Sequence, residues 1–293
     1  MFLFAAAASG QSAPKRPKIT GIDHVDFYTT SAEANTHLYT TVLGLNSVLP
    51  VEAGQTERYM IGKQWVGYSP APDPSATDRM DHAAFATGDV TALRAYLAAN
   101  AVKVSDLSKI PGTGRTSFRV QDPEGHTIEF VEQAKTRSRV QVDSTQAISR
   151  HMIHVGFIVR DRSAEDHFYK DILGFHLYWQ GGMHEDRNDW VAMQVPDGTD
   201  WLEYMLNIKP NPDQHTAGVM NHISLGVKDI KEAQAMLESH GWKEHGNEHA
   251  QMGRDGKWQL NIYDPDFTRI ELMEFKPTQK PCCSEFTGQH PTK

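Results

Sequence analysis

The sequence predicts an α+β fold built from four tandem βαβββ modules that form two domains. Its length of 293 residues allows two domains of about 100–150 residues each. A pattern of one strand, one helix and three short strands opens the chain, and a second copy begins near residue 80. From residue 151 the whole plan returns, which indicates a duplicated architecture.

The first module begins with a half-buried strand at residues 19–29, where apolar and polar residues alternate. Because every second side chain of a strand lies on one face, Ile22 and His24 head an inward set that extends toward Asp26. The helix that follows ends at Gly44, a residue type common just after helix C-termini. The three remaining strands are expected at residues 45–51, 58–61 and 64–68.

The second module repeats the first at an offset of 58 residues (82 − 24), since Met80–Phe85 echoes the strand around His24. Asp89 caps a helix whose apolar residues recur at i, i+3 and i+7. A tight turn at Asp122–Gly125 joins the last two strands of the module. Its strands are expected near residue 102 and at residues 116–121 and 127–131.

These repeats divide the chain into five segments. The stretch after residue 133 is polar and has no clear period, so it is interpreted as an interdomain linker. The expected segments are a signal-like stretch with a linker (1–18), an N-terminal domain (19–133), the interdomain linker (134–150), a C-terminal domain (151–276) and a tail (277–293).

Charge and hydropathy restrict the partners and the location of the protein. The net charge of −8 offers no basic stripe for phosphates, so no nucleic-acid partner is expected. No apolar run approaches the ~18 residues of a membrane-spanning helix. Residues 1–8 are apolar and precede small residues, as in a secretory signal, although no Lys or Arg comes before them. Export to the periplasm or beyond is therefore expected, with a cytoplasmic protein that has a disordered N-terminus as the alternative.

Two adjacent cysteines, Cys282 and Cys283, are the only ones in the chain. They cannot form a disulfide framework, and neighbouring cysteines pair only through a strained ring. Free thiols or an intermolecular link are equally compatible with this spacing. A poorly ordered tail is the favoured interpretation.

Each domain carries two histidines and one glutamate in separate strand-like runs. A single histidine on an apolar strand is usually a hydrogen-bonded core residue, but here the same combination occurs twice. Neutral imidazole and carboxylate suit Fe²⁺, Mn²⁺, Zn²⁺ or Ni²⁺, so a divalent metal ion is the expected cofactor. The candidate ligands are His24, His82 and Glu129 in the first domain and His154, His222 and Glu271 in the second.

The chain resembles the vicinal oxygen chelate superfamily, which includes glyoxalase I, type I extradiol dioxygenases and fosfomycin resistance proteins. The resemblance rests on the strands that open with histidine, on the helix ends at Tyr39–Leu45 and Tyr169–Phe175, and on the complete Asp-Pro-x-Gly-x-x-Ile-Glu motif at Asp122–Glu129. The second copy of that motif is altered, with Phe267 near the position of the glycine. The resemblance implies that each pair of modules forms a curved mixed sheet around one metal ion.

The resemblance also implies where a fourth ligand would lie. In glyoxalase I a glutamate occupies the last strand of the first module, and Glu203 stands in the matching strand of the second domain. The corresponding residue of the first domain is Gly67, so no fourth ligand is expected there.

Three functions follow from these residues. A glyoxalase-I-like lyase or isomerase is favoured by the full set of two histidines and two glutamates, with Glu203 and Glu271 as catalytic residues. An extradiol ring-cleaving dioxygenase fits the size and the C-terminal ligand triad, but Asn261 stands where such enzymes carry a tyrosine. A non-catalytic protein that binds an antibiotic-like molecule is the third alternative. All three imply a small-molecule partner, and a homodimer is left open.

Overall fold

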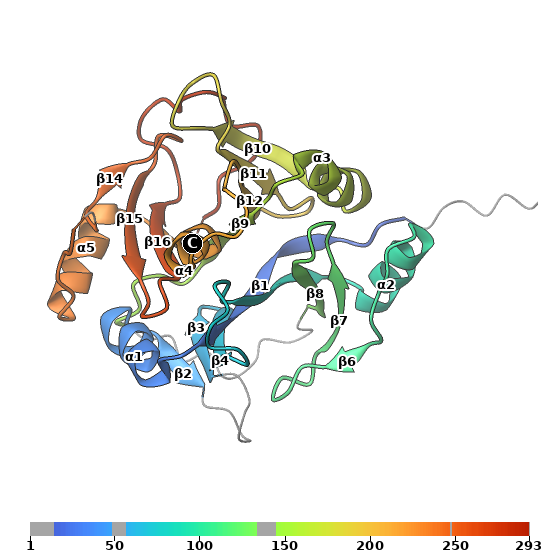
Figure 1. Cartoon of the computed structure of the whole chain (residues 1–293), viewed down its shortest axis with the longest axis horizontal. Coiled ribbons are helices and arrows are strands. Elements are labelled where there is room, and N and C mark those ends of the chain that lie inside the picture. The colour runs from blue at the N-terminus through green and yellow to red at the C-terminus, as the bar shows by residue number, and fades with distance from the viewer. Residues whose placement is uncertain (1–14, 49–56, 134–144, 247, 293) are drawn as a thin grey trace, which may run out of the picture.

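The computed structural model describes residues 15–48, 57–133, 145–246 and 248–292 (Figure 1). It contains two eight-stranded mixed sheets, one in each half of the chain. The predicted α+β fold of paired βαβββ modules is thereby confirmed. Most of the predicted signal-like stretch (residues 1–14) and most of the predicted linker (residues 134–144) lie outside the described residues.

Two modules form the N-terminal sheet. Their elements in chain order are β1 (Ile19–Thr29), α1 (Ala32–His37), a π-helical turn η1 (Leu38–Val42), β2 (Asn46–Val48), β3 (Glu57–Ile61), β4 (Gln64–Pro70), β5 (Met80–Thr87), α2 (Val90–Ala99), β6 (Ser108–Lys109), β7 (Thr116–Gln121) and β8 (Thr127–Glu132). The strand order is β2-β3-β4-β1-β5-β8-β7-β6. The opening strands β1 and β5 are therefore antiparallel neighbours at the centre, and each is flanked by the parallel last strand of its own module.

The C-terminal sheet repeats this arrangement in the order β10-β11-β12-β9-β13-β16-β15-β14. A short helix, α4, precedes its second module and was not predicted from the sequence. The elements in chain order are β9 (Met152–Ile158), α3 (Arg162–Glu165), η2 (Asp166–Ile172), β10 (His176–Gly181), β11 (Trp190–Gln194), β12 (Trp201–Met205), α4 (Gln214–Met220), β13 (His222–Val227), α5 (Ile230–Ser239), β14 (Gln251–Met252), β15 (Trp258–Tyr263) and β16 (Arg269–Glu274).

The helix signals of the sequence act as expected. The side chain of Asp89 accepts a hydrogen bond from the amide of Ala92, and Asp229 caps α5 in the same way. Gly44 and Gly174 follow the two π-helical turns with positive φ angles of 65° and 78°. Glycine adopts this left-handed conformation without a steric penalty, so both helical segments end where the sequence predicts.

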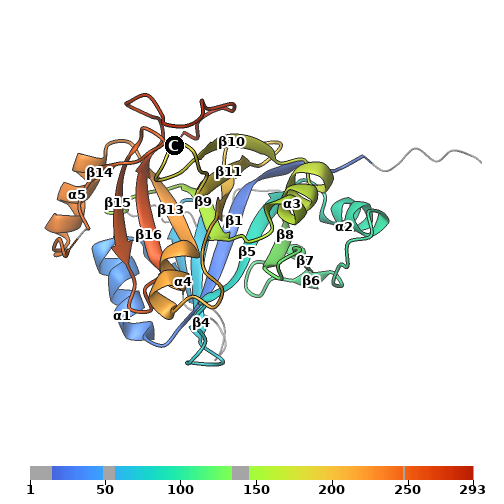
Figure 2. The same ribbon diagram turned by 45° about the horizontal axis from the view of Figure 1, so that its top comes forward.

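The two halves share one hydrophobic core. Phe85 of the N-terminal sheet and Phe175 of the C-terminal half meet edge to face, with ring centroids 5.4 Å apart. The helix of each first module lies beside the opposite half, as Figures 1 and 2 show for α1 and α3. Accordingly, Tyr96 donates a hydrogen bond to the carbonyl of Ile172 at 2.8 Å. Each half therefore packs a helix of its first module against the other half.

Polar contacts between the halves follow the same pseudo-symmetry. Gln64 bonds both the amide and the carbonyl of Met152, at 2.7 and 2.9 Å. Asp200, which like Gln64 precedes the tryptophan of its strand, accepts the amide of Ile22 at 2.9 Å. These bonds fix the start of each opening strand against the other half, and satisfy backbone groups that would otherwise be buried without partners.

The C-terminal tail differs from its prediction. Instead of being poorly ordered, residues 277–292 lie against the C-terminal sheet, where the amide of Thr287 donates to the carbonyl of Tyr178 at 3.0 Å. Phe286 packs on the ring of Tyr178 with centroids 4.8 Å apart. Cys282 and Cys283 form a disulfide with each other rather than free thiols or an intermolecular link.

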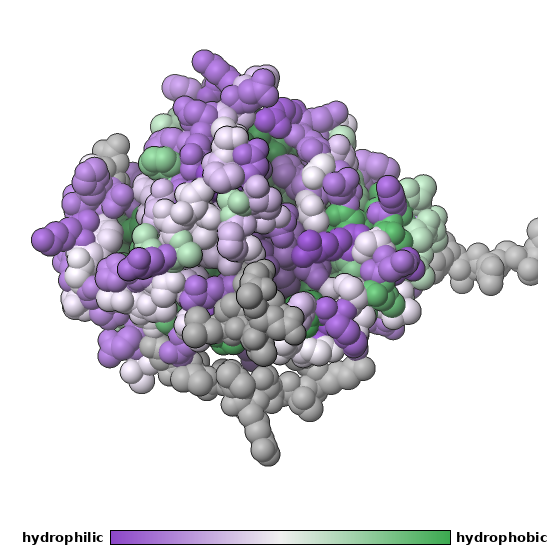
Figure 3. Space-filling model, turned by 60° about the horizontal axis from the view of Figure 1, so that its bottom comes forward, coloured by the Kyte–Doolittle hydropathy of each residue, from purple (hydrophilic) through white to green (hydrophobic). Residues whose placement is uncertain are grey.

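The outer surface agrees with the polar composition. Among the described residues, no helix is long and apolar enough to cross a membrane. Hydrophilic residues dominate the face shown in Figure 3, and hydrophobic ones occur there in small patches.

A buried acidic cluster lies between the halves. Asp122 accepts hydrogen bonds from His126 at 2.7 Å and from the hydroxyl of Tyr169 at 3.1 Å. Glu165 is fully buried, and one of its oxygens accepts the amide of Glu124 while the other has no hydrogen-bond partner among the described residues. Burial and the neighbouring charge of Asp122 raise the pKa of Glu165 to about 8.

This raised pKa predicts that the protein loses stability as the pH rises. The protonated Glu165 of the folded state contributes stability that is fully present below the usual glutamate pKa and is lost as the pH rises through about 8. Glu165→Gln should therefore flatten the fall in unfolding free energy between about pH 5 and 9, by up to roughly 4 kcal/mol. Urea denaturation across this range measures the effect. The control Glu33→Gln, at an exposed site, should show the same pH dependence of the unfolding free energy as the wild type. A Glu165→Gln variant with that same pH dependence would contradict the prediction.

Candidate metal centres

The C-terminal candidate ligands come from four adjacent strands. His154 lies on β9, His222 on β13, Glu271 on β16 and Glu203 on β12. The antiparallel pairing of β9 with β13 sets His222 opposite Gly156, two residues from His154. A Cβ atom on Gly156 would lie 2.2 Å from the His222 ring, so only glycine leaves room for this imidazole.

The distances among these side chains suit one shared ion. The Nε2 atoms of His154 and His222 are 3.0 Å apart, and His154 Nε2 is 3.2 Å from Glu271 Oε2. Glu203 Oε2 lies 3.7 and 3.5 Å from the same two nitrogens. Two atoms that are each about 2.1 Å from one ion lie roughly 3–4 Å apart. All four side chains are buried, and Glu271 Oε2 accepts no hydrogen bond from the described residues, so the donor set fits a divalent metal ion.

Local charges hold these groups in the forms that bind metals. The Nδ1–H of His222 donates to the carbonyl of Met220 at 2.8 Å, so Nε2 carries the lone pair, which accepts a hydrogen bond from Arg269 at 2.7 Å. Burial and the nearby Arg269 guanidinium lower the pKa of His222 to about 4. Burial opposes ionisation of Glu271, but His154 and Arg269 outweigh it and lower the pKa of Glu271 to about 2. A neutral imidazole therefore faces an ionised carboxylate.

The N-terminal candidate ligands form a second cluster of the same kind. His24 Nε2 lies 3.1 Å from His82 Nε2, and Glu129 Oε2 lies 3.4 and 2.8 Å from these nitrogens. All three residues are buried. The structure thus places all seven candidate ligands in two clusters, four of them in the C-terminal half and three in the N-terminal half. Their role as ligands stays a prediction.

Carboxylates outside the N-terminal cluster orient its histidines. The Nδ1–H of His24 donates to Asp23 at 2.8 Å, and that of His82 donates to Asp81 at 2.7 Å. Burial opposes protonation of His24, but its bonds to Asp23 and Glu129 outweigh burial and raise its pKa to about 9. The signal for these partners was present in the sequence, because an aspartate directly precedes each histidine.

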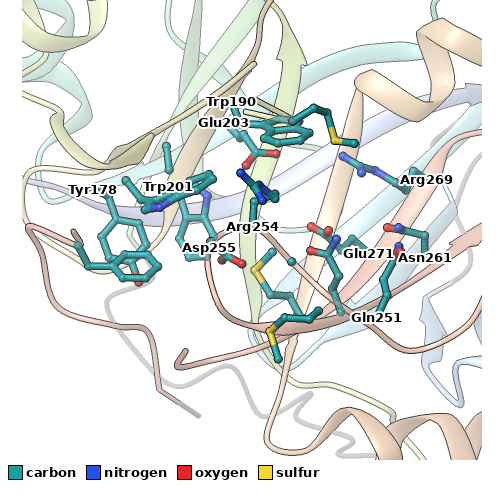
Figure 4. A pocket seen from close by; sticks show the side chains of 18 residues that line it. Tyr178, Trp190, Trp201, Glu203, Gln251, Arg254, Asp255, Asn261, Arg269 and Glu271 are labelled. Carbon is teal, nitrogen blue, oxygen red and sulfur yellow. The ribbon is translucent and has the colours of Figure 1, made fainter. Parts of the chain in front are cut away.

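A cavity of about 350 Å³ opens beside the C-terminal cluster. Tyr178 and Trp201 stand on one side, while Glu203 from β12 and Arg269 and Glu271 from β16 lie around the space (Figure 4). Apolar walls with a few convergent polar groups are typical of small-molecule sites. The cavity is thus suited to a small, partly apolar ligand that reaches the glutamates.

A buried lysine behind the cavity wall was missed by sequence reasoning. Lys257 is fully buried, with Nζ 4.5 Å from the Trp201 ring centroid and 3.9 Å from Asp255. Burial lowers the pKa of Lys257 and raises that of Asp255 to about 6. Lys257 belongs to a polar turn, so no periodicity marks it as buried. His249 is exposed and does not line this cavity.

These features define a class of protein in which paired βαβββ modules form a curved sheet around a His-His-carboxylate cluster. The family model described as the Glyoxalase/Bleomycin resistance protein/Dioxygenase superfamily matches residues 21–130 and 151–272. The chain belongs to this superfamily. No curated protein sequence is significantly similar to it.

Solved structures share the fold over nearly the whole chain. Homoprotocatechuate 2,3-dioxygenase from Brevibacterium fuscum, in complex with 3,4-dihydroxyphenylacetate, is 19% identical, with a TM-score of 0.65 over 95% of this chain and 84% of that one. The 2,3-dioxygenase LapB from Pseudomonas sp. KL28 is 16% identical, with a TM-score of 0.65 over 95% of this chain and 96% of that one. At such low identity, these similarities establish the fold.

Removal of one histidine should affect one centre only. His222→Ala deletes a buried donor of the C-terminal cluster and should remove one equivalent of bound metal, while the cluster around His24 keeps its own. Elemental analysis of purified, metal-reconstituted protein gives the count per chain, and circular dichroism confirms folding. Unchanged metal content in His222→Ala would refute the C-terminal assignment.

Proposed function

We propose that the C-terminal centre binds Fe²⁺, Mn²⁺, Zn²⁺ or Ni²⁺ and catalyses a lyase or isomerase reaction on a small substrate that chelates through two neighbouring oxygens. The observation that carries this proposal is the position of Glu203, which lies within 3.7 Å of both histidine donors. The bound ion would supply Lewis-acid stabilisation of an enediolate-like negative charge.

Glu203 supports a reaction that moves a proton. With His154, His222 and Glu271 it completes four protein donors, which leaves two positions of an octahedral ion for the substrate oxygens. Burial opposes ionisation of Glu203, but His154 and His222 outweigh it and lower its pKa. The carboxylate is therefore available as a base beside the substrate, and it can return the proton to a neighbouring carbon.

The cavity wall supports binding of a substrate with an apolar part. Trp201 and Tyr178 provide flat apolar surface, and Arg254 adds a positive charge to the cavity lining. Burial of the glutamates keeps water away from the base, which strengthens its electrostatic interactions with bound substrate. If the protein is exported, glutathione is scarce in its surroundings, so a substrate without glutathione is favoured.

An extradiol ring-cleaving dioxygenase is the second candidate. The similarity of the whole fold to two ring-cleaving dioxygenases favours it. In that case His154, His222 and Glu271 alone would hold Fe²⁺, and Glu203 would act on the substrate without binding the ion. Asn261, which lines the cavity beside Glu271, offers no ionisable hydroxyl for such a reaction.

Replacement of Glu203 by glutamine tests the proposal. Glu203→Gln keeps the shape of the side chain but removes the base, so turnover of hemithioacetals by the Ni²⁺-, Zn²⁺- or Mn²⁺-loaded protein should fall by roughly 10²–10⁴-fold. Measurements at saturating metal separate this loss from weaker metal binding. Glu33→Gln, a change at an exposed site outside the cavity, is the control and should retain turnover.

The same variants separate the alternatives. Oxygen uptake on catechols by the Fe²⁺-loaded protein, without hemithioacetal turnover, would contradict the lyase proposal in favour of the dioxygenase. Ligand binding without a bound metal ion would contradict both enzymes and indicate a binding protein.

A further inference from the structure

The N-terminal cluster contains a carboxylate that the ligand pattern of the sequence did not include. Asp26 lies on β1, two residues after His24 and directly opposite His82 in the antiparallel pair β1–β5. Its Oδ2 atom is 3.9 Å from His82 Nε2, and donor atoms of His24, Asp26 and His82 all lie within 4.8 Å of one another. Asp26 Oδ1 is buried and has no hydrogen-bond partner among the described residues. A buried carboxylate oxygen without a donor is costly unless a cation satisfies it.

The hydrogen bonds of the two histidines require a positive group between them. Both Nδ1–H groups are engaged, by Asp23 and Asp81 respectively. When both rings are neutral, as in metal ligands, their Nε2 lone pairs face each other across 3.1 Å, and His82 Nε2 also lies 2.8 Å from Glu129 Oε2. Such an arrangement is repulsive without a proton or a metal ion in the gap. Two imidazoles that are each held by a carboxylate are typical of metal ligands.

The two halves supply their extra carboxylate from opposite members of the same strand pair. In the C-terminal half Glu203 on β12 stands opposite Gly156 on β9. In the N-terminal half Gly67 on β4 stands opposite Asp26 on β1. The glycine and the acidic residue have therefore exchanged strands, and each half has one carboxylate at this level of its sheet. Asp26 on the neighbouring strand β1 therefore supplies the carboxylate that is missing at Gly67.

Carboxylates outnumber arginines around the N-terminal cluster. Four carboxylates surround it, those of Asp23, Asp26, Asp81 and Glu129. Arg115 pairs with Asp23, Arg119 lies 3.6 Å from Glu129, and Arg58 lies over the ring of Trp65. When both histidines are neutral, as they are in metal ligands, the three arginines and four carboxylates sum to −1 (3 − 4). A divalent cation removes this excess negative charge.

We propose that the N-terminal half holds a second metal centre, in which Asp26 is the fourth protein ligand beside His24, His82 and Glu129. Two nitrogens and two carboxylate oxygens suit Zn²⁺, Fe²⁺, Mn²⁺ or Ni²⁺. This centre is independent of the reaction proposed for the C-terminal half.

Metal titration of the full-length chain tests this centre. Metal-free protein is titrated with Zn²⁺ in competition with a chelating dye, and wild type should bind two equivalents. Asp26→Asn, which keeps the size of the side chain, should weaken one equivalent at least tenfold and leave the other within twofold. Glu203→Gln is the matched control, because it removes the corresponding carboxylate of the other half and should weaken the other equivalent.

The background variant His222→Ala assigns the equivalents. It should retain one equivalent, whose affinity falls at least tenfold when Asp26→Asn is added. If wild type binds a single equivalent that survives in His222→Ala and weakens in Asp26→Asn, the N-terminal centre stands and the C-terminal one fails. Two equivalents of unchanged affinity in Asp26→Asn would overturn the inference, as would a single equivalent that His222→Ala abolishes.

A second measurement does not depend on variants. Anomalous scattering from wild-type crystals soaked in Zn²⁺ locates the ion directly, and an oxygen of Asp26 should lie about 2.0–2.2 Å from it. An ion bound by His24, His82 and Glu129 with Asp26 turned away would overturn the assignment of Asp26.

Discussion

The register of the central antiparallel strand pair is the constraint on which both candidate centres depend. In β1–β5 it sets Asp26 opposite His82, and in β9–β13 it sets Gly156 opposite His222. Because strand side chains alternate between faces, a slip of one residue would turn a histidine away from its partner and into the shared core. The reciprocal bonds of Gln64 and Asp200 fix the beginning of β9 and β1. Contacts between the halves thereby stabilise the register on which each cluster depends.

Periodicity, duplication and the family resemblance together predicted the fold and the two clusters. The alternation around His24 and the repeated Asp-Pro turns are local signals, and the second copy of each confirmed the first. The pairing of modules into one curved sheet followed from the resemblance, the strand order was not predicted, and the helix ends followed from Gly44 and Gly174, whose positive φ angles suit glycine. Ligands that depend only on position along a strand could therefore be identified from the sequence.

Features that depend on contacts between strands could not be predicted in this way. Asp26 lies on the same face as His24, but its place opposite Gly67 is a matter of sheet register, which one strand alone does not reveal. Lys257 is buried among the rings of Tyr178, Trp201 and Phe286 of the tail, which meet only in the folded chain. The tail was taken as poorly ordered because its sequence shows no partner, whereas its backbone and the side chains of Ser284, Phe286 and His290 contact β10.

The surroundings of the histidines suggest different tasks for the two halves. A carboxylate bonded to Nδ1 makes an imidazole a stronger donor at Nε2, and both N-terminal histidines have such a partner. In the C-terminal half His222 has only a backbone carbonyl, and His154 Nδ1 has no hydrogen-bond partner among the described residues. Weaker donors leave more positive charge on an ion, which favours polarisation of a bound substrate. The cavity adjoins this second cluster, so we expect tighter metal retention in the N-terminal half and chemistry in the C-terminal half.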